Sequence, residues 1–444
     1  MRIIQTIKNI FRIEDLRQRI LYTLGIILLY RLGKYVTLPG IDPSQLEMLK
    51  NQTSQGIMGL LDMFSGGAFS QASVFALGIM PYISASIVIQ LLGIVFPYFQ
   101  KMQREGESGR RKMNQYTRYL TVAILLLQGP SYLANLTNIL PPSAFILGGS
   151  FFKASSIVIL TAGTMFVMWL GEKITDKGIG NGISLIIMIG IIARLPQAFI
   201  FEWGTRVNGQ GGLVALLLEM VLLFAVVLVT ILLVQGTRRI PVQYARRIVG
   251  NKQYGGVRQY IPLKVNAAGV MPIIFAQAIM MLPIIIAGYA SSDSMTGFMS
   301  AFSNMYGFWY SFVTAVLIIA FTYFYTAITI NPVQMAEDMK KNGGFIPGVK
   351  PGRKTVEFLD SIMSRITLPG SIFLALIAIL PAIAVNFGVS NLFAQFYGGT
   401  SLLILVGVVL DTLQQIESHL LMRHYDGLMK SGRIKGRAGS VSAM

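Results

Sequence analysis

Blocks of about 20 mostly apolar residues recur along the chain, and they constrain its fold more than any other feature of the sequence. An α-helix of about 20 residues spans the roughly 30 Å of hydrocarbon in a bilayer. Every backbone N–H and C=O in that layer must find its partner within the protein, which a helix provides. Charged residues make up only 13% of the chain, whereas a soluble domain carries about 25%. The sequence therefore predicts an all-α integral membrane protein.

We predict ten transmembrane helices in the 444 residues. Several of them contain proline, for example Pro81, Pro272 and Pro369. Such helix breakers are tolerated where neighbouring helices or a water-filled cavity satisfy the freed backbone groups, so a protein that moves or lines a cavity is indicated. The approximate ranges of the spans are 20–38, 74–96, 119–136, 154–171, 182–201, 213–234, 267–290, 308–330, 366–386 and 400–418.

Lysine and arginine gather in alternate connections between the predicted spans. The connection at about 236–265 carries seven basic residues and no carboxylate, whereas 137–152 and 387–399 carry no charged residue. Because Lys and Arg mark the cytoplasmic side, we expect the basic connections and both chain ends in the cytoplasm. This orientation accounts for most of the net charge of +18. An acidic docking partner is a second explanation, and direct DNA binding is not expected.

The ten spans divide into two halves of five. The first half covers 1–209 and the second 210–444, with a flexible Gly-rich joint at 208–212. Since five is odd, the second half is inverted relative to the first, as in many proteins that move substrates across membranes. The first half begins with an amphipathic helix expected on the membrane surface. Its apolar face consists of Ile3, Ile4, Ile7, Ile10 and Phe11.

The segment at about 59–70, between the first two predicted spans, is apolar but too short to cross a bilayer. Gly66 and Gly67 interrupt it, and it leads directly into the second span. A re-entrant half-helix and an interfacial loop fit these properties equally well.

Residue types that carry chemistry in other proteins are scarce here. The chain has no cysteine and only two histidines, His419 and His424, so neither thiolate chemistry nor a metal site is expected. It lacks a Walker A motif, an HExxH motif and any Ser/His/Asp set, so we expect no enzyme activity and no cofactor. Glu219 and Asp411 fall within predicted spans, where an acid is a candidate functional residue. Both are near a span end, and we favour a structural role for them.

Five long motifs follow one another along the chain. They are LDMFSGGAFSQASVFALGIMPYISASIVIQLL at 61–92, EGESGRRKMNQYTRY at 105–119, GTMFVMWLGEKITDKGIGNGIS at 163–184, PLKVNAAGVMP at 262–272 and FYGGTSLLI at 396–404. Together they resemble the SecY family, the central subunits of the bacterial Sec protein translocase. The resemblance covers essentially the whole chain. It implies a clamshell of two inverted five-helix halves around a central pore, with a re-entrant plug helix and a lateral gate that opens toward lipid.

A ring of six isoleucines is implied by the resemblance as the seal of the pore. Ile79 and Ile83 are four residues apart and share one helix face, as do Ile183 and Ile187. The ring consists of Ile79, Ile83, Ile183, Ile187, Ile274 and Ile404. The implied plug residues on its outer side are Leu60, Leu61, Asp62, Met63, Phe64, Ser65, Gly66 and Gly67.

The resemblance also implies contacts with other groups. Gln90 and Asn266 correspond to part of a polar contact in the lateral gate, and the basic loops at about 236–265 and 331–365 correspond to docking sites. Many relatives carry Arg where this chain has Lys350, which keeps the charge but loses the bidentate guanidinium. The implied docking residues are Arg238, Arg239, Arg246, Arg247, Lys252 and Lys350. The implied partners are the motor ATPase SecA, the ribosome, the small membrane subunits SecE and SecG, signal-sequence-bearing polypeptides and membrane lipids.

These features predict a protein-conducting channel of the bacterial cytoplasmic (inner) membrane. It would translocate unfolded secretory proteins and release membrane segments laterally into the lipid, with energy supplied by a partner. A secondary transporter of small solutes is the alternative, since inverted repeats and broken helices also suit one. Such a transporter needs polar groups near the midplane, whereas the implied constriction here is aliphatic. A scaffold of a membrane complex is a third class, although ten spans with broken helices exceed what anchoring requires.

Overall fold

The computed structural model describes residues 13–46, 62–147, 149–208, 212–244, 247–249, 252–254, 258–277 and 306–430, and the single residues 49, 59, 279 and 280. The chain divides into two compact units. The first has the bounds Met1–Gln52, Leu61–Ala193 and Val408–Met444, and the second has the bounds Thr53–Leu60 and Arg194–Gly407. The predicted halves 1–209 and 210–444 rest on topology and stay a prediction. The predicted amphipathic helix at residues 1–12 lies outside the described residues.

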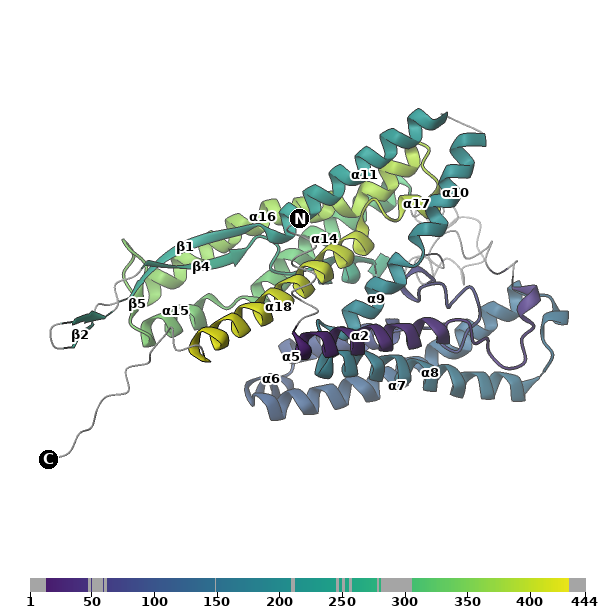
Figure 1. The fold of residues 1–444 in the computed structure, drawn as a ribbon, viewed down its shortest axis with the longest axis horizontal. Coiled ribbons are helices and arrows are strands. Elements are labelled where there is room, and N and C mark those ends of the chain that lie inside the picture. The colour runs from purple at the N-terminus through teal and green to yellow at the C-terminus, as the bar shows by residue number, and fades with distance from the viewer. Residues whose placement is uncertain are drawn as a thin grey trace. The chain divides into compact units, whose positions relative to one another are not determined.

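The first unit is a bundle of long helices, in which α8 packs against α2, α7 and α9 (Figure 1). Its described elements are α2 (Glu14–Gly33), η1 (Pro43–Gln45), α5 (Met80–Val95), α6 (Pro97–Arg104), α7 (Glu107–Ile139), η2 (Pro142–Ala144), α8 (Ser150–Lys177), α9 (Gly182–Ile192) and the later part of α18 (Gly399–Lys430).

The second unit combines helices with short strands, and α14 packs along α16 within it. Its described elements are α10 (Leu195–Asn208), α11 (Gly212–Gln235), β1 (Thr237–Tyr244), β2 (Arg247–Val249), β3 (Lys252–Tyr254), β4 (Arg258–Lys264), α14 (Phe308–Thr329), α15 (Pro332–Lys341), β5 (Gly344–Phe345), α16 (Arg353–Asn386), α17 (Asn391–Ala394) and the start of α18. Residues 271–277 and 279–280 are also helical.

Among the described residues, seven helices are long and apolar enough to cross a membrane. The bent pair α5 and α6 raises this number to eight if it forms one span. Two further predicted spans do not enter that set. One is α2, which has 20 residues but carries Arg17, Arg19 and Arg31. The other covers the helical residues near 271–280 and runs on beyond the described part of the chain. The structure is therefore a multi-pass α-helical membrane protein, as the sequence predicted.

The second predicted span begins later than its apolar pattern indicated. The sequence predicted a helix from residue 74, but α5 begins at Met80. The backbone before Met80 forms hydrogen bonds with residues 36–38 and not within a helix. The Val74 N–H donates to the Val36 carbonyl over 2.9 Å, and the Leu38 N–H donates to the Ala72 carbonyl over 2.8 Å. Gly78 then adopts a positive φ of 55°, a conformation that favours glycine.

The basic loop predicted at 236–265 is a β-hairpin, which the sequence analysis missed. Strand β1 pairs antiparallel with β4 from Thr237↔Lys264 to Gln243↔Arg258, and the short β5 joins the other side of β1. The sequence feature that indicates strand β1 is an alternation of apolar and polar residues, which places Ile240 and Val242 in the core while their neighbours face outward.

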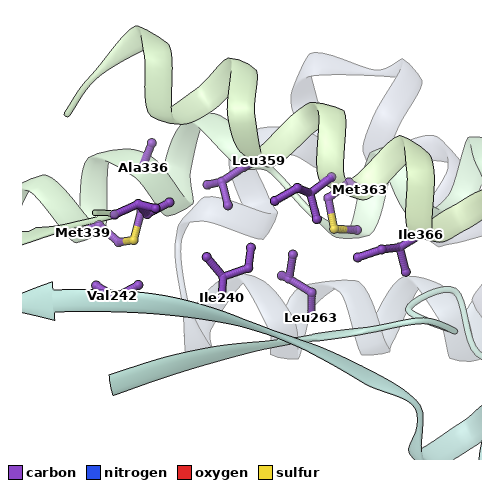
Figure 2. Packing of buried hydrophobic residues seen from close by; sticks show 10 residues of the cluster. Ile240, Val242, Leu263, Ala336, Met339, Leu359, Met363 and Ile366 are labelled. Atoms are coloured by element: carbon purple, nitrogen blue, oxygen red, sulfur yellow. The ribbon is translucent and has the colours of Figure 1, made fainter. Parts of the chain in front are cut away.

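This sheet is fixed to the helices of the second unit by a compact apolar core. Figure 2 shows Ile240, Val242 and Leu263 pointing from the strands toward side chains of α15 and α16. Helix α16 has 34 residues, or about 50 Å at 1.5 Å per residue, so it extends well beyond the hydrocarbon thickness. The buried cluster comprises Ile240, Val242, Leu263, Ala336, Met339, Ile346, Leu359, Ile362, Met363 and Ile366.

Candidate functional site

The predicted plug segment is, from Asp62 to Ser70, a buried, self-closed loop in the first unit. Residue 59 and residues 62–64 are helical, and turns follow from Ser65 onward, while Leu60 and Leu61 lie outside the described residues. Asp62 closes the loop. Its Oδ1 accepts the Ser70 N–H over 2.7 Å, and its backbone carbonyl accepts the Gly67 N–H over 2.7 Å. The Ser65 hydroxyl adds a second closure, since it donates to the Asp62 carbonyl and accepts from the Phe69 N–H, both over 3.1 Å.

Burial of this loop is nearly complete. Asp62 has no exposed side-chain area, and Met63, Phe64 and Ser65 are 2%, 5% and 2% exposed. An aspartate is buried only where polar partners replace water, and the loop's own N–H groups supply part of that replacement. Asp62 therefore has a structural reason to occupy this position in an otherwise apolar segment.

Helix α2 and helix α7 hold the loop by its backbone. The Tyr30 hydroxyl donates to the Ser65 carbonyl over 3.3 Å, and Arg31 Nη1 donates to the Gly66 carbonyl over 3.2 Å. From α7, the Tyr132 hydroxyl donates to the Phe69 carbonyl over 3.0 Å. The Tyr132 ring also packs edge-on against the Phe69 ring, with centroids 4.8 Å apart. These three donors are not predicted from the sequence, because nothing in their local pattern marks them.

Glycines bring the loop into contact with α9. A β-carbon on Gly66 would lie 2.9 Å from the Gly190 Cα, and one on Gly190 would lie 3.1 Å from the Phe64 carbonyl oxygen. Gly66 also has a positive φ of 65°. This close approach of two backbones leaves no room for a side chain on either residue.

The end of the loop is fixed by an aromatic row. The Phe75 ring stacks on Tyr30 at 6.2 Å and on Phe166 at 6.1 Å between centroids. A β-carbon on Gly33 would lie 1.9 Å from the Phe75 ring, so glycine makes space for it. Together with the backbone bonds near Ala72, this row holds the connection between the loop and α5.

Four of the six predicted ring isoleucines lie in the first unit. Ile79 is the N-cap of α5, and its carbonyl accepts the Ile83 N–H over 3.1 Å, so the two are one helical turn apart as predicted. Ile183 and Ile187 are one turn apart within α9. Ile183 also packs on α8, where a β-carbon on Gly171 would lie 3.0 Å from its Cγ1. The sealing role of these four residues stays a prediction.

The other predicted pore and gate residues are distributed over both units. Ile274 is half-buried and Ile404 is buried, both in the second unit. Gln90 lies on α5, where its Nε2 donates to the Ser86 hydroxyl over 3.4 Å. Asn266 follows β4, and its buried Oδ1 accepts no hydrogen bond from the described part of the chain. The gate contact between Gln90 and Asn266 stays a prediction.

Most of the predicted docking residues lie in the chain from β1 to β4 or in the loop after β5. Arg238 and Arg239 are exposed on β1, and Lys350 is exposed between β5 and α16. Arg247 and Lys252 lie on the paired strands β2 and β3, and Arg246 lies outside the described residues. Arg238 and Arg239 are thus carried by the sheet β4-β1-β5, which packs on an apolar core, whereas Arg247 and Lys252 belong to the separate two-stranded sheet β2-β3.

A buried ion-pair cluster in the second unit was also missed. Arg206 on α10 donates through Nε to Glu202 over 3.1 Å and through Nη2 to Glu219 on α11. The same Nη2 donates to the Gly388 carbonyl over 2.6 Å, and Glu202 accepts the Ser390 N–H over 3.0 Å. Glu219 is thereby accounted for by a structural role, as favoured from the sequence. The sequence feature that could have indicated this cluster is the i, i+4 spacing of Glu202 and Arg206, which places both on one helix face.

The long apolar helices define a polytopic membrane protein, and comparisons with known proteins specify its family. The SecY family profile matches residues 73–413, and the chain belongs to the SecY family. It is 44% identical over 436 residues to protein translocase subunit SecY of Streptomyces galbus, with 95% of this chain and 98% of that protein covered. It is 43% identical over 440 residues to the same subunit of Corynebacterium glutamicum, with 95% and 98% covered. The chain is therefore a protein-translocating channel, and the comparisons give the solute-transporter alternative no support.

Solved structures share its fold at low sequence identity. One described as a protein conducting channel has a TM-score of 0.56 at 17% identity, covering 90% of this chain and 92% of that one. A SecY structure concerning the plug domain and the closed state has a TM-score of 0.59 at 18% identity, with 90% and 92% covered. Sec61 in a canine ribosome-channel complex has a TM-score of 0.51 at 16% identity, with 90% and 92% covered.

Proposed function

We propose that the loop at 59–70 and the six isoleucines together close this channel at rest, and that the seal requires both. The observation that carries the proposal is the loop's own closure through Asp62, whose Oδ1 accepts the Ser70 N–H over 2.7 Å. A segment folded on itself can leave its site as a unit without unfolding the helices around it. Side chains of neighbouring helices also donate hydrogen bonds to the loop's carbonyls; a neutral bond of this kind contributes only about 0.5–1.5 kcal/mol, and one from a charged donor about 1.5–3 kcal/mol. A stopper that must be displaced repeatedly requires bonds of this strength.

The aliphatic ring would seal by dewetting. Water gains no hydrogen bonds in a narrow apolar constriction, so ions do not cross it while it is empty. Isoleucine carries no polar atom and is stiff at its first torsion in a helix. A passing unfolded polypeptide would displace these side chains without being bound by them. Membrane segments would leave toward lipid through the lateral gate, where Gln90 and Asn266 contribute polar side chains.

The docking function is proposed for the basic residues from β1 to β4 and in the loop after β5. Arg238, Arg239, Arg247, Lys252 and Lys350 would bind the ribosome or the motor ATPase SecA in the cytoplasm, and Arg246 belongs to the same loop. The apolar core under β1 and β4 supports this proposal, because it fixes β1, which carries Arg238 and Arg239, to α16. The ribosome-bound Sec61 structure, which shares this fold, supports a ribosomal partner. SecE and SecG are the proposed small membrane subunits, and both chain ends are proposed to be cytoplasmic, in the bacterial inner membrane.

Deletion of residues 60–70 tests the plug. The variant should insert and purify, because the segment is too short to span and only residues 62–64 of its described part, 62–70, are helical. It should conduct ions at rest in planar bilayers, whereas a variant lacking the tail 431–444 should not. A deletion variant as tight as the parent would contradict the sealing role, and one that fails to insert would show that the segment is structural.

A further inference from the structure

Side chains of neighbouring helices hold the plug loop by donating hydrogen bonds to its backbone carbonyls. Tyr30, Arg31 and Tyr132 donate to the carbonyls of three loop residues within a five-residue stretch, Ser65 to Phe69. Backbone carbonyls are present whatever the side chains are. These hydrogen bonds therefore fix the position of the loop and do not depend on its side-chain sequence. Gly190 completes the same contact from α9 by backbone approach to Gly66.

We propose that Arg31 and Tyr132 are positioning residues that set how readily the plug leaves its closed position, with Gly190 as the surface against which it rests. The proposal rests on the plug function proposed above and deepens it. The connection at Ala72 to Phe75 has bonds of its own to residues 36–38 and to Tyr30. Displacement of the loop at Ser65 to Phe69 must therefore break the hydrogen bonds from Tyr30, Arg31 and Tyr132, while the connection at Ala72 to Phe75 can stay in place.

Arg31 should dominate this contact. Its guanidinium is a charged donor, and hydrogen bonds to charged groups are the stronger class. It also lies in the last turn of α2, next to Tyr30, so two donors from one helix end reach adjacent loop residues, Ser65 and Gly66. Tyr132 acts from a different helix and adds ring packing on Phe69, which a Tyr132→Phe change retains.

The absence of cysteine from the chain makes a direct test of plug position available. Ala68 lies inside the loop and is 1% exposed, so Ala68→Cys places the only thiol where reagents reach it when the loop opens. We would measure its modification rate by a methanethiosulfonate reagent in the full-length chain, reconstituted in lipid vesicles. In this background Tyr132→Phe should raise the rate roughly two- to tenfold, and Arg31→Gln roughly ten- to hundredfold.

Matched controls lie on the same two helices. Tyr119→Phe removes an exposed hydroxyl from α7 and Arg17→Gln removes an exposed charge from α2, so both should leave the rate within about twofold of the parent. Arg31→Lys keeps a charged donor and should recover part of the loss caused by Arg31→Gln. This partial recovery distinguishes positioning through the Gly66 carbonyl from general damage to α2.

Gly190→Ala provides an independent variant that removes no hydrogen bond. Its added methyl group would press on the Phe64 carbonyl and the Gly66 N–H, at 3.1 and 3.2 Å, and should also raise the modification rate of the thiol introduced by Ala68→Cys. Unchanged rates in Tyr132→Phe, Arg31→Gln and Gly190→Ala would overturn the proposal. Raised modification rates support the positioning role of these residues. They do so even if deletion of residues 60–70 causes no ion leak, because the absence of a leak would overturn only the sealing role of the plug.

Discussion

At the scale of single residues, the cluster of Arg206, Glu202 and Glu219 is the most demanding arrangement of charge in the described part of the chain. The side chains of Arg206, Glu202 and Glu219 are 10%, 0% and 6% exposed, so water stabilises none of them appreciably. Their hydrogen bonds to Gly388 and Ser390 tie α10 and α11 to the connection that follows α16. Removing one partner of such a cluster leaves an uncompensated buried charge, whereas replacing all of it does not.

We therefore predict that Arg206→Met lowers the free energy of unfolding by about 3–5 kcal/mol. The triple variant Glu202→Gln, Arg206→Met, Glu219→Gln should lie much closer to the parent. The control is Arg118→Met, which breaks a more exposed pair with Glu172 (44% and 26% side-chain exposure) and should cost at most about 1 kcal/mol. Denaturation in detergent micelles measures all three. Equal losses for the single and the triple variants would contradict this account of the cluster.

At the scale of elements, strand β1 of the sheet β4-β1-β5 carries two of the proposed docking charges, Arg238 and Arg239. Since Ile240 and Val242 fix β1 from below, charge reversal at exposed Arg239 should weaken docking without unfolding the sheet. We predict that Arg239→Glu reduces binding of ribosomes or SecA most strongly at low salt, because exposed charges are screened within about 8–10 Å near physiological ionic strength. Lys153→Glu, the same charge change at an exposed position of α8, should have no effect. Sedimentation with ribosomes at several salt concentrations measures this, and binding unaffected at low salt would remove the sheet from the docking site.

The elements also show how far sequence reasoning reaches. Hydrophobic length predicted α7, α8, α11, α14 and α16, because a span needs about 20 apolar residues whatever its neighbours are. It failed at the start of α5, where the Val74 N–H bonds to Val36, a residue 38 positions away in the sequence. The hydrophobic pattern also failed to predict β1, because only two apolar residues alternate there, in a loop that carries seven basic residues. Arg31, Tyr132 and Gly190 could not be found from sequence, since their role depends on contacts between segments that the chain brings together only on folding.

At the scale of the whole molecule, physics alone left a channel and a solute transporter open, and family membership decided between them. What distinguishes the two physically is the constriction. A transporter binds its solute through polar groups near the midplane, whereas a protein-conducting pore must exclude ions without binding anything. In the proposed mechanism the six isoleucines exclude ions through their apolar side chains, and together with the loop at 59–70 they would form the seal.

We predict that Ile83→Asn combined with Ile187→Asn raises the resting conductance in planar bilayers, because amide groups wet the constriction without widening it. The corresponding double change to Gly should both wet and widen it, and should also relax discrimination against defective signal sequences in an import assay with the motor. Val88→Asn and Ile192→Asn provide the control, since both residues lie on the same helices, α5 and α9, but are exposed at 40% and 38%. Ile404→Asn extends the test to the second unit and should raise conductance by itself. If the ring variants stay as tight as the parent while the control pair conducts, the pore lies along other helix faces than those proposed.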